Sequence, residues 1–192
     1  MTHEVETASN RYRVRSPVIG ALATAAAAWL SLPLWADDAK PTTSSPAAAG
    51  IRVSGVGLKS IALLPADLDK MPRRTVKAVD HDTTVTFEGW LVGDLLKKAG
   101  FTFGQHFRGP RLADYLTVTS ADGFRVVFAL AELDAEFSDR VVLLADRENG
   151  KPLAERDGPY RIIVSDEKKH ARWVRNAASL NVATSSPDKA AP

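Results

Sequence analysis

An apolar stretch without a single charged residue, Val18–Ala36, limits how much of this chain can join a globular fold. Arginines precede the stretch and two aspartates follow it, which is the arrangement of a secretory signal. We predict that residues 1–36 are a signal peptide cleaved after Ala36, and that the mature protein is periplasmic or secreted without stable membrane insertion. An uncleaved membrane anchor is the alternative, because a bilayer span needs about 20 apolar residues.

The rest of the chain is expected to form one folded domain between two short polar segments. Residues 37–50 and 184–192 are rich in Pro, Ser, Thr and Ala, which predicts a flexible linker and a disordered tail. Residues 51–183 are long enough for one domain with its own hydrophobic core. The sequence contains no cysteine, so a disulfide, a thiolate metal ligand and a cysteine nucleophile are all excluded.

The charge and the known short motifs exclude several classes of function. The chain has 25 Lys and Arg against 23 Asp and Glu, and these charges are scattered, so we expect no nucleic-acid partner. It has no Gly-x-Ser-x-Gly elbow, no phosphate-binding P-loop, no dinucleotide fingerprint and no His-Glu-x-x-His helix. It has only four histidines, one of them in the predicted signal, so a site with several histidines is not expected.

Alternating apolar residues and turn sequences predict more strand than helix. Hairpins are predicted around Asp80–Thr83 and around Ala121–Gly123, where Asp-Gly is a strong turn signal. The apolar spacing in Leu91–Ala99 predicts a helix that ends before a glycine. Shorter helices are predicted over residues 130–137 and 170–175. The expected fold class is α+β, with a mixed, largely antiparallel β-sheet and short helices.

Several segments occur in an order that resembles a known family. They are ALLPADLDKMPRRTVKAVDH, VTFEGWLVGDLLKKAG, YLTVTSADGFRVVFALAELD, VVLLADRENGKPL, GPYRIIVSD and ARWVRNAASLNV. Together they resemble the molybdopterin-binding domain of the sulfite oxidase fold. This resemblance implies an oxidoreductase whose molybdenum is held by the dithiolene of a pterin and by one cysteine thiolate. In the family the thiolate comes from the stretch that reads TVKAVDHDTTVTFEG here, and this stretch has no cysteine.

The first candidate site is the turn of the first hairpin, where His81 lies between Asp80 and Asp82. Two carboxylates beside an imidazole can orient the ring, bind a cation or transfer a proton. The resemblance places His81 in the loop that carries the metal ligand in the family. The alternative is a solvated β-turn, in which aspartate is common.

The second candidate site is a loop that carries His106, Arg108 and Arg111 near three phenylalanines. Guanidinium groups bind phosphate and other oxyanions through paired hydrogen bonds, so this loop can hold a pterin phosphate or another anion. The alternative is an ordinary loop with exposed arginines and buried phenylalanines.

The third candidate site is the pair Arg172 and Arg175, which bracket a tryptophan near a predicted helix end. Residues three apart on a helix can point to the same side, so the pair can form a second anion contact. The alternative is that these arginines form ion pairs with Glu132, Asp134 or Glu136.

The sequence therefore predicts an exported, molybdopterin-binding-domain-like protein that is related to oxidoreductases by family. We expect it to use a degenerate cofactor cleft to bind a small anion or a protein partner. The alternatives are an active periplasmic molybdopterin-dependent oxidoreductase without a cysteine ligand, which would need a periplasmic or membrane redox partner, and an interaction protein without a ligand. Molybdopterin enters only through the resemblance, and neither a metal ligand nor a catalytic residue is predicted. The predicted cofactor-binding residues are His81, His106, Arg108, Arg111, Arg172 and Arg175.

Overall fold

The computed structural model describes residues 50–185. The predicted signal peptide, the predicted linker up to residue 49 and the tail from residue 186 lie outside the described residues. The strands are β1 (Ile51–Gly55), β2 (Ile61–Leu63), β3 (Arg74–Asp80), β4 (Thr83–Leu91), β5 (Asp114–Ser120), β6 (Arg125–Ala129), β7 (Val142–Glu148), β8 (Lys151–Pro152), β9 (Arg161–Val164) and β10 (Ala177–Thr184).

The helices are few and short. The α-helices are α1 (Pro65–Leu68) and α2 (Val92–Lys98), and the 3₁₀ turns are η2 (Gly104–His106), η3 (Gly109–Ala113), η4 (Leu130–Leu133) and η5 (His170–Arg172). Among residues 50–185, no helix is both long enough and apolar enough to cross a membrane.

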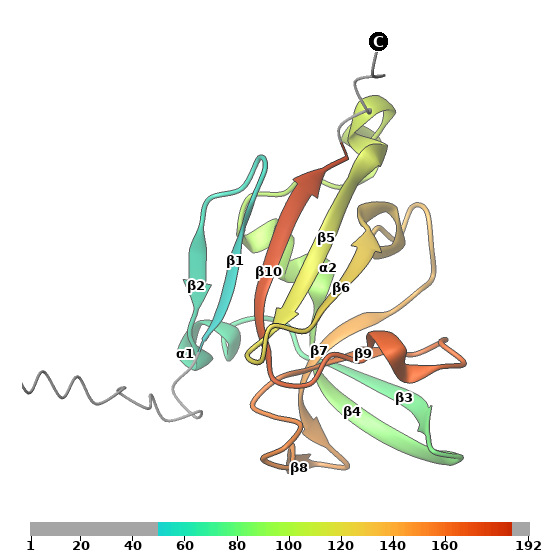
Figure 1. The fold of residues 1–192 in the computed structure, drawn as a ribbon. Helices are drawn as coiled ribbons and strands as arrows, with labels where there is room; N and C mark the ends of the chain where they lie inside the picture. The colour runs from blue at the N-terminus through green and yellow to red at the C-terminus, as the bar shows by residue number, and fades with distance from the viewer. Residues whose placement is uncertain (1–49, 186–192) are drawn as a thin grey trace, which may run out of the picture. The chain divides into compact units, whose positions relative to one another are not determined.

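The strands form two sheets (Figure 1). The first has the order β2-β1-β10-β5-β6, and β1 runs parallel to β10 while the other neighbours are antiparallel. The second has the order β3-β4-β7-β8, with β9 also paired to β7, and its pairs are antiparallel. The predicted α+β class with a mixed, largely antiparallel sheet is therefore confirmed.

The two predicted hairpins and the predicted helix are present. The β3–β4 hairpin closes with Asp80 opposite Thr83, and the β5–β6 hairpin turns around the predicted Asp-Gly pair. Helix α2 is followed by Gly100, whose φ of 102° favours glycine because it has no Cβ. Local sequence signals thus predict these elements correctly.

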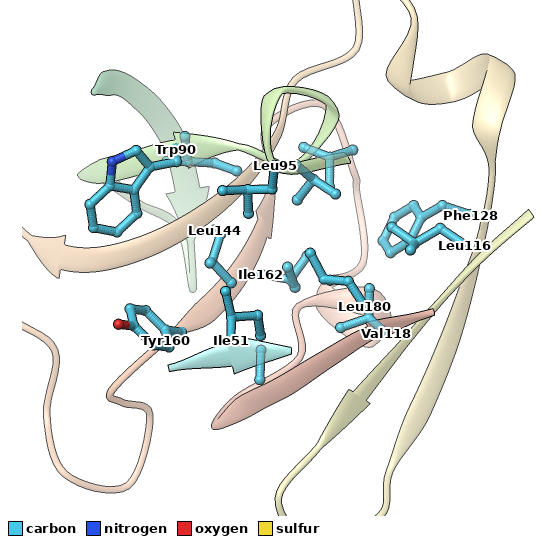
Figure 2. Close-up of a cluster of buried hydrophobic side chains, with 14 of the residues drawn as sticks. Ile51, Trp90, Leu95, Leu116, Val118, Phe128, Leu144, Tyr160, Ile162 and Leu180 are labelled. Atoms are coloured by element: carbon cyan, nitrogen blue, oxygen red, sulfur yellow. The ribbon is translucent and has the colours of Figure 1, made fainter. Parts of the chain in front are cut away.

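One hydrophobic core joins the two sheets and helix α2 (Figure 2). Leu180 of β10, Leu144 of β7 and Leu95 of α2 are each fully buried in it. Strand β9 is buried along its whole length, which includes the charged Arg161. Apolar burial of this kind supplies most of the folding free energy of a domain without disulfides.

Two predicted short helices are shorter in the structure than the sequence suggests. The turn η4 ends at Leu133, because the Asp134 carboxylate accepts hydrogen bonds from the backbone N–H of Gly104 (2.8 Å) and Glu136 (3.1 Å). Such local bonds compete with helical ones. The turn η5 ends at Arg172, and the chain then adopts a left-handed φ of 48° at Asn176.

Candidate functional site

The β3–β4 turn presents a histidine to solvent. His81 and Asp82 form a two-residue turn and have φ values of 47° and 64°, a region in which histidine and aspartate are enriched among non-glycine residues. Positive φ at both central residues matches the twist of a two-stranded hairpin. The His81 side chain is 84% exposed, whereas that of Asp80 at the end of β3 is only 13% exposed.

Asp80 is held by a buried arginine from β9. The Arg161 Nη1 lies 3.3 Å from Asp80 Oδ2, and the Arg161 side chain is only 5% exposed. The guanidinium carbon of Arg161 lies 5.3 Å from the ring centre of Trp173 and 5.8 Å from that of Phe87. A buried charge needs a partner, and Asp80 provides it. This pairing leaves the other carboxylate oxygen, Oδ1, facing the turn.

A second histidine reaches the same carboxylate from η5, which follows β9 along the chain. The His170 Nδ1 lies 3.3 Å from Asp80 Oδ1, and the His81 Nδ1 lies 2.6 Å from the same oxygen. His170 stacks on Trp173 with ring centres 3.9 Å apart and ring planes 23° apart. Trp173 is itself fixed by a 3.1 Å hydrogen bond from its Nε1 to the carbonyl of Val164. Packing thus sets the position of His170.

We call Asp80, His81 and His170 the His–Asp cluster. Each of the three offers one nitrogen or oxygen atom, and these atoms all lie within 4.8 Å of one another. Partial burial favours the neutral form of Asp80, but attraction to Arg161 and the hydrogen bond from His81 outweigh it, so the pKa of Asp80 lies below its usual value. The cluster therefore presents an ionised carboxylate oxygen beside two imidazole nitrogens.

The cluster borders an open pocket, which we call the turn pocket. Its volume is about 490 Å³, and it lies between the β3–β4 turn and the loop that leads from β9 to η5. It is lined by Val79, His81, Asp82, Ser165, Asp166, Glu167, Lys168 and His170. Three of the lining residues are acidic and one is a lysine, and two of the acidic ones, Asp166 and Glu167, form ion pairs with arginines.

Sequence analysis identified His81 but missed His170 and Arg161. His170 is distant from the turn in sequence, and the pairing of β4 with β7 and of β7 with β9 brings it there. One feature of the sequence does point to a buried partner: Arg161 is a charged residue at the start of an otherwise apolar strand. A charge within a buried strand implies a buried partner.

Arg172 lies in a separate network of ion pairs. Its Nε donates to Glu167 Oε1 at 2.6 Å, and its Nη2 donates to Glu132 Oε2 at 3.2 Å. Arg140 contacts Glu132 as well, and its Nε lies 3.0 Å from Asp166 Oδ2. We call these five residues the Glu132 network. The ion pair of Arg172 with Glu132 is one of those that the sequence analysis gave as the alternative to anion binding.

Arg175 does not share a side of a helix with Arg172, because η5 ends before it. Its Nε instead lies 2.8 Å from Asp157 Oδ1, and the Asp157 side chain is 7% exposed. The expected common anion contact of the two arginines is therefore replaced by two separate sets of carboxylate partners.

The loop at residues 101–111 forms another surface. Arg111 lies over the ring of Phe101 at 4.7 Å, and its Nε is 3.9 Å from Asp114 Oδ2. His106 and Arg108 are exposed, and within residues 50–185 neither side chain forms an ion pair. The six predicted residues thus fall into separate groups with different contacts rather than into one cleft.

The side chains present do not fit a thiolate-bound molybdopterin. The chain has no sulfur donor other than methionine, and the turn that the resemblance assigns to the ligand carries imidazole and carboxylate groups. Arg111, Arg172 and Arg175, which were predicted to hold an anionic cofactor, already face carboxylates.

Comparison with known proteins supports the fold. No protein-family model and no curated protein sequence matches the chain. Among solved structures, the chain is similar to the sulfane dehydrogenase SoxCD from Paracoccus pantotrophus, with a TM-score of 0.56 and 18% sequence identity. The match covers 72% of this chain and 39% of the SoxCD chain, so it spans about two-fifths of that protein. The likeness shows a shared fold.

Proposed function

We propose that this chain is an exported binding module that retains the fold of an oxidoreductase domain without its redox chemistry. Its ligand site is the turn pocket beside the His–Asp cluster. The observation that carries the proposal is the replacement at the β3–β4 turn. Where the resemblance implies a cysteine ligand for molybdenum, the chain has an aspartate and a histidine tied to His170 and to the buried Arg161.

The donor chemistry supports the loss of molybdenum. The metal of the resembling family is bound by soft sulfur, whereas imidazole and carboxylate are harder donors. The ion-paired arginines also argue against an anionic cofactor, because guanidinium groups already bound to carboxylates have fewer free donors for a phosphate. Of the arginines predicted to bind an anion, Arg108 is the one that forms no ion pair within residues 50–185, so an anion is expected at Arg108 and the neighbouring His106.

Elemental analysis tests the proposal. The full chain is expressed in a host that makes molybdopterin, purified from the periplasm, and analysed for molybdenum by mass spectrometry and for pterin by fluorescence after oxidation. A molybdopterin enzyme with a cysteine ligand, prepared in the same host, is the control for cofactor supply. We expect molybdenum and pterin far below one per chain. One molybdenum per chain would instead establish the alternative, an active oxidoreductase with ligands other than cysteine.

A further inference from the structure

We propose that the His–Asp cluster is a binding site for a divalent transition-metal cation of the zinc type. This inference rests on the proposed function and names the ligand class of its site. The donor atoms are a carboxylate oxygen of Asp80 and one ring nitrogen each of His81 and His170. Zinc is bound in proteins by combinations of these groups, whereas Mg²⁺ and Ca²⁺ prefer sites made of oxygen alone.

The distances suit a tetrahedral site after a small adjustment. With metal–ligand bonds of about 2.1 Å, the donor atoms of a tetrahedral site lie about 3.4 Å apart. The His170 Nδ1 is 3.3 Å from Asp80 Oδ1, and the His81 Nδ1 is 2.6 Å from it. The three donor atoms all lie within 4.8 Å of one another. Rotation of the exposed His81 ring can lengthen its contact with Asp80 and bring its nitrogen closer to that of His170. Three protein ligands leave a fourth position open toward solvent or toward a ligand in the turn pocket.

Two of the three ligands are held in place by residues that do not bind the metal. Arg161 contacts Asp80 through Oδ2 and leaves Oδ1 available, while Trp173 stacks against His170. Such outer contacts orient ligands and typically change metal affinity by about 10–100-fold when removed. The buried Arg161 and Trp173 therefore act as positioning residues for the site.

Both acidic and basic side chains surround the cluster. Asp82, Asp166, Glu167 and Lys168 line the turn pocket, and Asp166 and Glu167 are paired with Arg140 and Arg172. Asp80 faces the buried Arg161 through Oδ2, so its carboxylate would balance both that arginine and a bound cation. Without metal, both imidazoles can donate a hydrogen bond to the Asp80 carboxylate. A cation bound through the two Nδ1 atoms would take the place of these hydrogen bonds.

Calorimetric titration of the full chain with ZnCl₂ tests the site. The protein is purified without a histidine tag and treated with chelator. We expect one Zn²⁺ per chain and no binding of Mg²⁺. His81→Ala and His170→Phe should each weaken binding at least about 10-fold. The phenylalanine keeps a ring against Trp173, and His81 is exposed, so both variants should fold.

Controls separate this site from weak surface binding. Glu155→Gln removes one exposed negative charge outside the cluster and should leave the affinity unchanged. His106 remains in every variant, so weak binding by an exposed imidazole is common to all of them. Co²⁺ should give the intense visible absorption of a tetrahedral site in the wild-type chain, and this absorption should be lost in His170→Phe.

The outcomes distinguish this inference from the proposed function. Absence of stoichiometric Zn²⁺ binding, or binding by His81→Ala and His170→Phe that is as tight as in the wild type, rejects the metal site. If the chain also lacks molybdenum, the binding-module proposal stands with a different ligand. One molybdenum per chain rejects the binding module itself, whatever the zinc titration shows.

Discussion

Two neighbouring groups of charged side chains, the Glu132 network and the His–Asp cluster, differ in how their charges are balanced. In the Glu132 network each arginine contacts two carboxylates, so its hydrogen-bonding groups are used within the protein. In the His–Asp cluster one carboxylate serves a buried arginine and two imidazoles at once. In the network the charges pair one with another, whereas in the cluster three possible metal-donor atoms meet within 4.8 Å of one another.

The largest effect is expected from breaking the link between the cluster and the core. Asp80→Ala leaves the buried Arg161 without its carboxylate, and we expect a loss of about 3 kcal/mol in the free energy of unfolding. Urea unfolding measures this loss of stability. The double variant Asp80→Ala/Arg161→Met should lose less than the sum of the two single variants, because it removes the unpaired charge. Additive losses would show that the two residues do not interact.

A smaller effect is expected within the Glu132 network. Glu132→Gln removes a carboxylate shared by Arg140 and Arg172, but the side chains are 26–29% exposed and each arginine keeps another acidic partner. We expect a loss of about 1 kcal/mol, since ion pairs open to water contribute little. Zinc affinity should not change. A large loss of zinc affinity in Glu132→Gln would show that the Glu132 network and the His–Asp cluster act as one site, which contradicts the distinction between them.

The network should also make stability depend on pH. Burial raises the pKa of Glu132, but hydrogen bonds from Arg172 and Arg140 outweigh it, so the pKa in the folded chain is below its usual value of 4.5. The stabilisation is therefore present above the pKa of the unfolded chain and is lost as the pH falls through the lowered folded pKa. Urea midpoints measured from pH 6 to pH 3 should fall less steeply for Glu132→Gln than for the wild type; equal slopes contradict this assignment.

The smallest effect concerns the turn itself. Asp82 has a φ of 64°, a conformation that glycine adopts without a Cβ clash. We expect Asp82→Gly to change the stability by only about 0.5 kcal/mol in the stabilising direction, because glycine is favoured at the second position of such a turn. Thermal unfolding is the measurement. A clear loss of stability would show that the aspartate supports the turn. The expected gain would show that aspartate is less stable than glycine at this position.

Local signals were enough to predict the elements, but not the arrangement of the site. The Asp80–Thr83 turn, the Asp-Gly hairpin and the helix before Gly100 each depend on a few adjacent residues, so the sequence reveals them. The predicted signal peptide and residues 186–192 of the predicted tail remain predictions, because they lie outside residues 50–185, whereas Thr184, which was predicted as the first residue of the tail, is the last residue of β10.

The site depends on contacts that are far apart in the sequence. His170 meets Asp80 only because β9 pairs with β7, and β7 with β4. Arg172 and Arg175 do not lie on one helix, because the short turn η5 ends at Arg172. The acidic partner of Arg175, Asp157, lies in a loop that carries no motif. The residue types at the β3–β4 turn predicted a candidate site, but the tertiary fold determines which other residues lie next to it.

X-ray absorption at the zinc edge tests the central claim most directly, because it reports the atoms bound to the metal in the full chain. A zinc-loaded sample should show only nitrogen and oxygen neighbours at about 2.0–2.1 Å, with the outer scattering of two imidazoles. In His170→Phe the imidazole scattering should fall. A spectrum without imidazole scattering, or one that is the same in His170→Phe and in the wild type, would contradict a site formed by Asp80, His81 and His170.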